Sequence, residues 1–395
     1  MSTRYADRME LVKPSAIRQL LQLGADPSII SFGGGYPDSS LFPAQALQDI
    51  YAELLSGPGE ASLQYTHSTG MPKLREQITA RMAREGIACS DDNVLILQGS
   101  QQGLDLAARL LLNPGDIVAT EAPTFLGALL AFNTCQPEYL AVPMDEQGMM
   151  TEVLEAELQA GKRIKFIYTV PDFHNPTGIT LSLARRRHLI ALANQYDFII
   201  LEDSPYREVR YQGEKVATLK GMDTEGRVIY FGSFSKILAP GLRLGWSVAS
   251  KEITEKLGLL KLAADTQCST LNMAAVSLYL ERHDIDEHIQ TIKARYLRKK
   301  ETMLAAIKAH FPQTISFTNP DGGLFTWLEF PQGVDTAQFM LHHAIPEAKV
   351  AYVPGGSFFP TLQRHNFARF SYSTHSDENI VKGIATLGKV LKQHL

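Results

Sequence analysis

Short apolar runs alternate with longer amphipathic segments through the middle of this chain, and no other feature restricts its fold as strongly. The runs are apolar on nearly every residue, as strands inside a parallel sheet are. They span Val94–Leu97, Ile117–Ala119, Ile164–Val170, Phe198–Leu201 and Val228–Phe231. Amphipathic segments such as Gly103–Leu112 and Ser182–Tyr196 lie between them. Strand and helix in alternation predict an α/β fold whose strands are joined by crossover helices.

The pattern changes near residue 275, and 395 residues are too many for one simple core. A long charged helix, His283–His310, leads into three strand-like runs: 314–318, 324–330 and 368–373. We therefore predict a large cofactor-binding domain over residues 41–275. A smaller α+β domain would combine residues 1–40, with a helix at Ser15–Leu23, and residues 276–395.

Composition excludes several classes of protein. A net charge of −4 with 20% charged residues disfavours nucleic-acid binding. The basic run Arg185–Arg187 is better explained as a solvated helix start. Three scattered cysteines (Cys89, Cys135 and Cys268) suggest neither disulfides nor a metal site. No leader-like or membrane-spanning apolar stretch is evident, so a cytoplasmic location without membrane association is expected.

Lys236 lies in the stretch Gly232-Ser-Phe-Ser-Lys-Ile-Leu-Ala-Pro-Gly-Leu-Arg-Leu-Gly245, which favours capture of a phosphorylated aldehyde. Its amine can form a Schiff base, while the Ser233 and Ser235 hydroxyls and the Arg243 guanidinium can hold phosphate oxygens. Pyridoxal 5′-phosphate combines these needs. The alternative is an ordinary solvated surface lysine.

Two further motifs follow strands. Gly99-Ser-Gln-Gln-Gly103 opens a helix, whose first N–H groups and the Ser100 hydroxyl can bind an anion, although a plain tight turn is the alternative. The run Val170-Pro-Asp-Phe-His-Asn-Pro-Thr-Gly178 lies where ligands of open α/β sheets collect. Asn175 can donate there to the ring oxygen of the cofactor, unless the run is only turn chemistry.

Two charged residues lie in strand patterns where charge is costly unless paired. Asp203 in Ile199-Ile-Leu-Glu-Asp-Ser-Pro-Tyr206 would be paired by a protonated pyridine nitrogen, with Tyr206 beside the ring oxygen. An N-cap role for Asp203 is the alternative. Arg369, in an alternating strand pattern, would bind a substrate carboxylate or form a structural ion pair.

With these motifs in this order, the chain resembles the class I/II aminotransferases, pyridoxal-phosphate enzymes of fold type I, from about residue 30 onward. It is most similar to the branch of 2-aminoadipate, kynurenine and multi-substrate aminotransferases. The cues are Ser15-Ala-Ile-Arg18, Phe32-Gly-Gly-Gly-Tyr-Pro37, Leu63-Gln-Tyr-Thr66 and Tyr352-Val-Pro-Gly-Gly-Ser-Phe-Phe359. The resemblance implies a mostly parallel central sheet with helices on both faces and a smaller α+β domain.

The resemblance also implies residue roles. Lys236 would bind the cofactor covalently, Asp203 its ring nitrogen, and Asn175 and Tyr206 its ring oxygen. Phosphate would contact Ser100, Gln101, Ser233, Ser235 and Arg243, with Phe125 stacked on the ring. Substrate would meet Arg369, Asn175, Gly35 and, by hypothesis, Arg18 and Tyr36. Tyr65 would reach the phosphate of a neighbouring subunit, so a homodimer with shared active sites is expected.

Two residues depart from the pattern of the family. His174 replaces a usual glutamine and Tyr36 a usual aliphatic residue, and we expect both to border the substrate pocket. The expected reaction moves an amino group from an L-amino acid to a 2-oxo acid, 2-oxoglutarate or pyruvate. A β-lyase or decarboxylase using the same cofactor is the alternative. A non-catalytic regulator is another, although it would need a DNA-binding module for which the sequence leaves no room.

Overall fold

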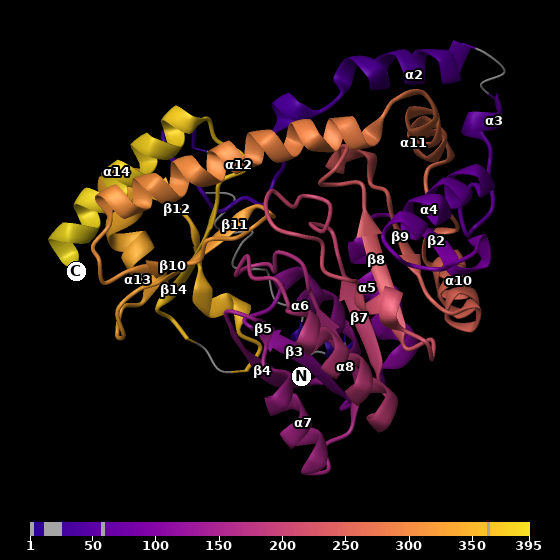
Figure 1. Cartoon of the computed structure of the whole chain (residues 1–395), viewed down its shortest axis with the longest axis horizontal. Helices are drawn as coiled ribbons and strands as arrows, with labels where there is room; N and C mark the ends of the chain where they lie inside the picture. The colour runs from indigo at the N-terminus through magenta and orange to yellow at the C-terminus, as the bar shows by residue number, and fades with distance from the viewer. Residues whose placement is uncertain (1–3, 12–25, 57–59, 362–363) are drawn as a thin grey trace.

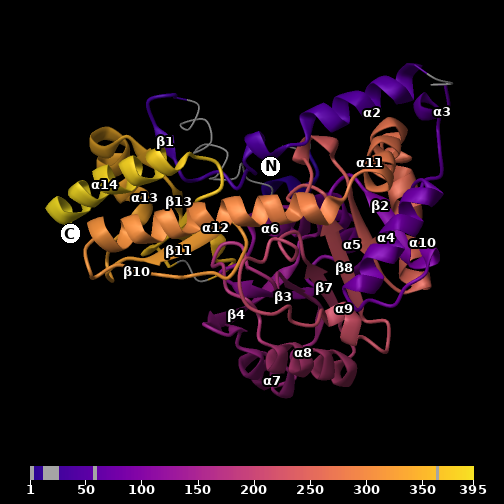
Figure 2. The same ribbon diagram turned by 45° about the horizontal axis from the view of Figure 1, so that its top comes forward.

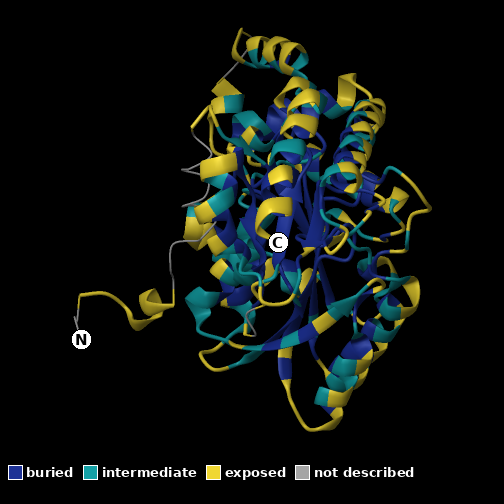
Figure 3. Cartoon of the chain, turned by 90° about the vertical axis from the view of Figure 1, so that its left-hand side faces the viewer, coloured by how far each residue is buried: buried dark blue, intermediate teal, exposed yellow. Residues whose placement is uncertain are grey.

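The computed structural model describes residues 4–11, 26–56, 60–361 and 364–395 (Figure 1). These residues form an eight-stranded sheet, a four-stranded sheet and a two-stranded sheet, all covered by helices. The expected helix Ser15–Leu23 lies outside the described residues. Figure 3 shows that the strands are buried, while the outer faces of the helices are exposed.

The large sheet has the strand order β2-β9-β8-β7-β6-β3-β4-β5. Strands β8, β7, β6, β3 and β4 pair in parallel, and β2, β9 and β5 pair antiparallel at the two edges. The bounds are β2 Val94–Leu97, β3 Ile117–Ala122, β4 Glu138–Asp145, β5 Gly148–Met149, β6 Ile164–Thr169, β7 Ile199–Asp203, β8 Val228–Ser233 and β9 Gly245–Val248.

All five apolar runs of the sequence are strands of this sheet, which confirms the predicted α/β class. Three of them extend past the apolar residues: β3 includes Glu121, β7 ends on Asp203 and β8 ends on Ser233. These polar residues lie at the carboxyl ends of parallel strands, at the edge where ligands of such sheets bind.

Successive residues of the parallel strands point into two different cores. On β7, Ile200 packs in the core that includes α7 and α8, whereas Leu201 packs in the core that includes α5. On β8, Val228 and Ile229 divide in the same way. Because side chains alternate between the faces of a strand, helices cover both faces of the sheet, as predicted.

The helices around this sheet fit the amphipathic segments expected for crossovers. Their bounds are α2 Ala44–Ser56, α3 Glu60–Leu63, α4 Pro72–Arg84, α5 Ser100–Leu111, α6 Leu126–Phe132, α7 Thr151–Gln159, α8 Leu183–Tyr196, α9 Leu219–Met222, α10 Lys251–Asp265 and α11 Thr270–Arg282. Short helical turns are η1 Asp7–Glu10, η2 Ser39–Leu41, η3 Asp91–Asn93, η4 Asn133–Cys135 and η5 Pro240–Leu242. Over the described ranges, we find no helix with both the length and the apolar character needed to cross a bilayer.

The basic run at the start of α8 is solvated only in part: Arg187 is exposed and Arg185 half-buried, whereas the prediction was wrong for Arg186. Arg186 is fully buried, and its Nη2 donates to Asp172 Oδ1 at 2.9 Å. Arg207 Nη1 also donates to Asp172, at 3.1 Å. Burial alone would raise the pKa of Asp172, but the two guanidinium groups outweigh it and hold that pKa below its ordinary value. Arg186 therefore neutralises a buried acid beneath the carboxyl ends of the strands.

The small sheet has the antiparallel order β10-β11-β14-β13, beside a parallel pair of β1 and β12. The bounds are β1 Ile30–Ser31, β10 Ser316–Phe317, β11 Phe325–Glu329, β12 Val350–Ala351, β13 Val353–Pro354 and β14 Phe367–Ser371. Its helices are α12 Ile285–His310, α13 Thr336–Phe339, the π-helix η6 Met340–Ala348, η7 Gly355–Phe358 and α14 Asp377–His394.

Helix α12 runs past both sheets (Figures 1 and 2). Its first half contributes Ile289 and Ile292 to a core of the large sheet, and its second half contributes Met303 and Ile307 to the core of the small sheet. We propose the domain division 41–275 against 1–40 with 276–395. The pairing of β1 with β12 and the separate cores support it.

Candidate active site

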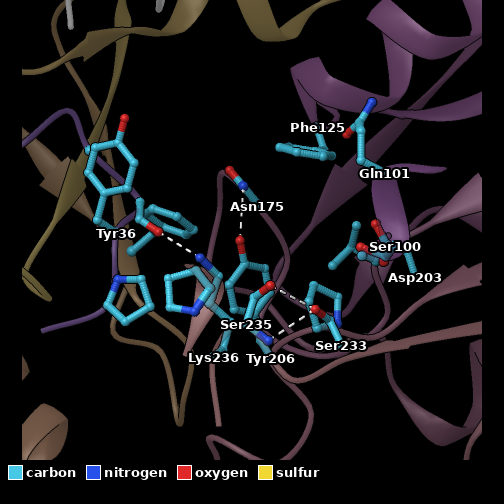
Figure 4. A pocket seen from close by; sticks show the side chains of 18 of the residues that line it. Tyr36, Ser100, Gln101, Phe125, Asn175, Asp203, Tyr206, Ser233, Ser235 and Lys236 are labelled. Carbon is cyan, nitrogen blue, oxygen red and sulfur yellow. Dashed lines mark hydrogen bonds between the residues drawn. The ribbon is translucent and has the colours of Figure 1, made fainter. Parts of the chain in front are cut away.

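One cavity of about 360 Å³ opens at the carboxyl ends of the parallel strands, next to the small sheet. Nearly all the residues proposed from the sequence line it, and Figure 4 shows many of them pointing toward one another. They are Gly35, Tyr36, Ser100, Gln101, Phe125, Asn175, Asp203, Tyr206, Ser233, Ser235, Lys236, Arg243 and Arg369. Tyr65 is 79% exposed and does not line the cavity. Arg18 lies outside the described residues.

An anion-binding corner lies where β8 ends and α5 begins. Gly99 precedes α5 with φ +79°, and a Cβ there would come within 2.9 Å of Arg243 Nη2. Glycine therefore allows the guanidinium to approach the start of the helix, where backbone N–H groups lack helical partners. Ser233 Oγ donates to Ser235 Oγ at 2.9 Å. Hydroxyls, a guanidinium and free N–H groups together suit a phosphate dianion.

Gln101 and Arg243 also have contacts within the chain. Gln101 Nε2 donates to the Gly127 carbonyl at 2.7 Å, so its side-chain amide is already engaged. Arg243 Nη2 donates to the Gln98 carbonyl at 3.0 Å, and Arg243 itself is exposed. Gln101 can thus offer its backbone N–H to an anion, while Arg243 keeps further N–H donors available.

Lys236 lies three residues after the end of β8. Its Nζ donates to the Gly35 carbonyl at 2.7 Å, which links the large sheet to the N-terminal segment (Figure 4). Burial, together with the positive charges of Arg369 and Arg243, lowers the pKa of this amine to about 8. Roughly a tenth of the amine is therefore neutral at pH 7, far more than for a solvated lysine.

Asp203 ends β7, next to β8, and is buried. Its Oδ2 accepts a hydrogen bond from Tyr168 Oη at 2.8 Å, whereas Oδ1 has no partner in the described chain. Burial raises the pKa of Asp203 to about 7; the Tyr168 hydrogen bond opposes this rise and the charge of Glu121 adds to it. A buried carboxylate oxygen without a partner at a cavity wall is suited to a cationic ligand group. The alternative N-cap role is wrong, because no helix begins at Asp203.

Asn175, Tyr206 and Arg369 form one hydrogen-bonded group. Asn175 Nδ2 donates to Tyr206 Oη at 3.2 Å, and Arg369 Nη1 donates to Asn175 Oδ1 at 2.7 Å. Arg369 Nη2 donates to the Gly33 carbonyl at 2.8 Å, and Nε has no partner in the part of the chain described. The guanidinium also lies over the ring of Phe325, 4.3 Å from its centroid. Burial lowers the pKa of Arg369 to about 10.

None of the ion pairs that the described residues form involves Arg369. The alternative prediction, that Arg369 forms a structural ion pair, is therefore wrong. A buried guanidinium without a carboxylate is costly unless a ligand supplies one. Arg369 therefore fits a ligand carboxylate at the edge of the cavity.

A buried cluster behind Asp203 was missed in the sequence. Glu121 Oε1 accepts from Thr169 Oγ1 at 2.5 Å, and His174 Nε2 lies 3.0 Å from Glu121 Oε2. His174 is fully buried and does not line the cavity, so the expectation that it borders the substrate pocket was wrong. An acid near the end of an apolar strand was the available signal for Glu121, the same signal that pointed to Asp203.

Comparison with known proteins is consistent with this site. A family model described as aminotransferase class I and II matches residues 28–387. Aromatic-amino-acid aminotransferase 1 of Thermococcus litoralis is 40% identical over 396 residues, which cover 99% of this chain and 94% of that protein. The 2-aminoadipate transaminase of Thermus thermophilus is 36% identical over 384 residues, covering 96% and 94% of the two chains.

Among solved structures, kynurenine aminotransferase from Pyrococcus horikoshii superposes with a TM-score of 0.95 at 39% identity, covering 99% of this chain and 98% of that one. Sequence and structure thus agree over nearly the entire chain, and they agree with the branch that the motifs indicated. The chain belongs to the class I and II aminotransferases, the pyridoxal-phosphate enzymes of fold type I.

Proposed function

We propose that this aminotransferase transfers the amino group of an L-amino acid to a 2-oxo acid, 2-oxoglutarate or pyruvate, with Lys236 as the residue that carries the chemistry. The strongest support is that two neighbouring strands, β7 and β8, bring a carboxyl group and an amine to the same cavity. Strand β8 leads to an amine whose pKa is lowered to about 8, and β7 ends on a carboxylate with an unpartnered buried oxygen.

The residues present fit pyridoxal phosphate. Asp203 Oδ1 can face the ring nitrogen, and Asn175 Nδ2 and Tyr206 Oη can meet the ring oxygen. The anion-binding corner can hold the phosphate, and Phe125 can stack on the ring. When bound, the cofactor supplies an electrophilic aldehyde and a ring that accepts electrons from the substrate α-carbon.

Lys236 is the proposed base. Because its amine is partly neutral at pH 7, Nζ can take the proton from the α-carbon of the substrate. Nζ could then return that proton to the carbon that came from the cofactor aldehyde. Nζ first has to leave the Gly35 carbonyl, its hydrogen-bond partner in this structure. Asp203, as the ionised partner of a cationic ring nitrogen, would keep a proton on that nitrogen.

Arg369 is the proposed anchor of the substrate α-carboxylate. Its buried charge lacks a carboxylate partner in the described chain, and its contacts with Asn175 and Gly33 fix the fork in place. Tyr36 and Gly35 lie on the same wall of the cavity, where the rest of the substrate would extend. Arg18 stays a proposal for a contact with a distal acidic group.

We further propose a homodimer in which Tyr65 reaches the phosphate of the neighbouring active site. Tyr65 is 79% exposed, so its ring is available for contact with a second subunit. A cytoplasmic location likewise stays a prediction from composition.

Replacement of Lys236 tests the assignment. We expect Lys236→Ala to lower kcat by about 10³-fold or more, because both the covalent anchor and the base are lost. Borohydride reduction of the wild type with bound cofactor should label the peptide that contains Lys236. Lys215→Ala is the matched control, since Lys215 is exposed and pairs with Glu85 away from the cavity. Full activity in Lys236→Ala would refute the proposal.

Product analysis tests the reaction class. With a donor screen spanning aromatic, branched and acidic amino acids, each donor consumed should yield one 2-oxo acid and one new amino acid from the acceptor. Release of ammonia or carbon dioxide in equal amount to the donor would instead show a lyase or a decarboxylase.

A further inference from the structure

Two histidines and a glutamate converge on the surface, where η6 meets the end of α14. His343 and Glu347 lie one turn apart on η6, and His394 lies in the last turn of α14. Glu347 Oε1 lies 2.8 Å from His343 Nδ1, and Glu347 Oε2 lies 3.1 Å from His394 Nε2. We call these three residues the His343–Glu347–His394 cluster. None of them lines the active-site cavity.

Packing holds the cluster together. Helices η6 and α14 pack against each other, and the end of α14 lies beside α13 and the following segment in Figures 1 and 2. The rings of His343 and His394 are 3.9 Å apart between centroids, and the ring of Phe339 lies 5.3 Å from that of His343. Each of the three side chains is only about a third exposed. Helix packing and the contact between the two rings therefore keep the three side chains near one another.

The donor set is that of a transition-metal site. One ligand atom from each residue can be chosen so that all three lie within 4.8 Å of one another. Tetrahedral Zn²⁺ with bonds of about 2.0–2.1 Å places its ligands about 3.4 Å apart, a change that side-chain rotation can supply. Two imidazoles with one carboxylate suit Zn²⁺ and its neighbours in the first transition row, whereas Mg²⁺ and Ca²⁺ prefer oxygen ligands alone.

The charge of the cluster points the same way. The cluster contains one carboxylate, that of Glu347, which would supply a negative charge to a bound cation. Each oxygen of this carboxylate is within hydrogen-bond distance of a ring nitrogen of one histidine. A divalent ion would replace those two hydrogen bonds with three coordinate bonds and leave its fourth position to water.

From this geometry we propose that the His343–Glu347–His394 cluster binds a divalent transition-metal ion, with Zn²⁺ as the best match. The ion joins the last turn of α14 to η6. It therefore stabilises the folded small sheet and its helices without taking part in amino transfer. This proposal is independent of the proposed function, because none of its ligands lies in the cavity.

Equilibrium dialysis against ZnCl₂ tests the site, with tag-free holoenzyme and metal analysis of both compartments. The wild type should bind one Zn²⁺ that His343→Ala and His394→Ala each weaken by about tenfold or more, since even indirect partners of a metal contribute about that much. Glu347→Gln, which keeps the shape of the side chain, should weaken binding likewise. His342→Ala is the matched control: His342 neighbours His343 but bonds to Gln338, and its loss should leave binding unchanged.

Two further measurements complete the test. Zn²⁺ should raise the Tm of the wild type and of His342→Ala but not that of His394→Ala, and transaminase activity should be equal in all variants, which shows that they fold. Co²⁺ added to the wild type should give the visible absorption of a tetrahedral site. The proposal is overturned if the wild type binds Zn²⁺ no more tightly than the His343→Ala/His394→Ala double variant. It is also overturned if His342→Ala weakens Zn²⁺ binding as much as His343→Ala does.

Discussion

The two walls of the active-site cavity are built in different ways. The wall from the large sheet consists of strand ends and helix starts, and its polar residues end a strand or lie in the segment that follows one. The facing wall brings Gly33–Pro37, Phe325 and Arg369 together from segments almost 340 residues apart, and it presents one guanidinium among aromatic rings. We propose that the first wall fixes the cofactor chemistry and that the second selects the substrate.

Only a few hydrogen bonds join the two walls. Lys236 Nζ reaches the Gly35 carbonyl, and Arg369 reaches Asn175. These contacts link the proposed base and the proposed ring-oxygen donor to the substrate side. Changes on the large-sheet wall should therefore reduce turnover with every donor, whereas changes on the facing wall should alter which donor is used.

The largest effect is expected from Asp203→Asn on the large-sheet wall. Without a negative partner, the ring nitrogen would lose its proton, and kcat should fall by about 10³-fold with aromatic and acidic donors alike. Steady-state kinetics with both donor classes measure this. A loss confined to one class would contradict the division of roles between the walls.

Asp203→Asn should lower turnover but raise the stability of the protein without cofactor. Because burial raises the folded-state pKa of Asp203 to about 7, ionisation of this one group makes the folded state less stable as pH rises from about 4 to 7. Asp203→Asn should then be more stable than the wild type at pH 8, by about 1–3 kcal/mol, and equally stable near pH 4. Thermal unfolding of the two cofactor-free proteins at both pH values measures the difference.

Arg369→Ala on the facing wall should have the next largest effect. Loss of a buried guanidinium that meets a carboxylate should lower kcat/KM for amino acids by about 100-fold or more. A primary amine without a carboxylate is the control substrate, and its slow reaction should not change. Arg369→Lys separates charge from geometry, since it keeps the charge but loses the fork. Equal losses for amine and amino acid would show that Arg369 acts only on the structure.

The large-sheet wall could be predicted from the sequence because each of its motifs directly follows a strand. Asn175, Asp203 and Lys236 lie at or after the ends of β6, β7 and β8, and parallel strands bring such ends to one edge. Ser100 follows β2, which points the same way as β8 because β9 is antiparallel to both. The predicted bounds of β3, β7 and β8 are short at this edge, because an apolar run ends before the polar residues that complete the strand.

Two buried charged pairs, Glu121 with His174 and Arg186 with Asp172, could not be predicted from the sequence. Glu121 on β3 meets His174 after β6 only because β3 and β6 pair, and sequence separation does not reveal that pairing. Arg186 was assigned to the surface because three arginines in a row suggest solvent, yet one of them points inward to Asp172. Both cases involve buried charges whose partners lie far away in the sequence.

A smaller effect is expected from Tyr168→Phe, which acts on the large-sheet wall through Asp203. The Tyr168 hydrogen bond holds the Asp203 pKa down, so its loss should raise that pKa and require a higher pH for ionisation. The acidic limb of the kcat profile should move to higher pH, with kcat at neutral pH lower by about tenfold or less. Tyr139→Phe is the matched control, because its hydroxyl binds Asn133 outside the cavity.

The smallest and most selective effect is expected from Tyr36→Leu on the facing wall. Tyr36 lines the cavity but is 55% exposed, so its ring can shape the entrance without supporting the core. Its removal should change the ratio of kcat/KM for aromatic over acidic donors by about tenfold or less, since one side-chain contact is worth about 1–3 kcal/mol at most. Cofactor affinity, measured by titration of the visible absorbance, should stay constant because the phosphate and ring contacts lie on the other wall. If affinity for the cofactor fell together with activity toward every donor, Tyr36 would belong functionally to the large-sheet wall, and the separation of the two walls would be wrong.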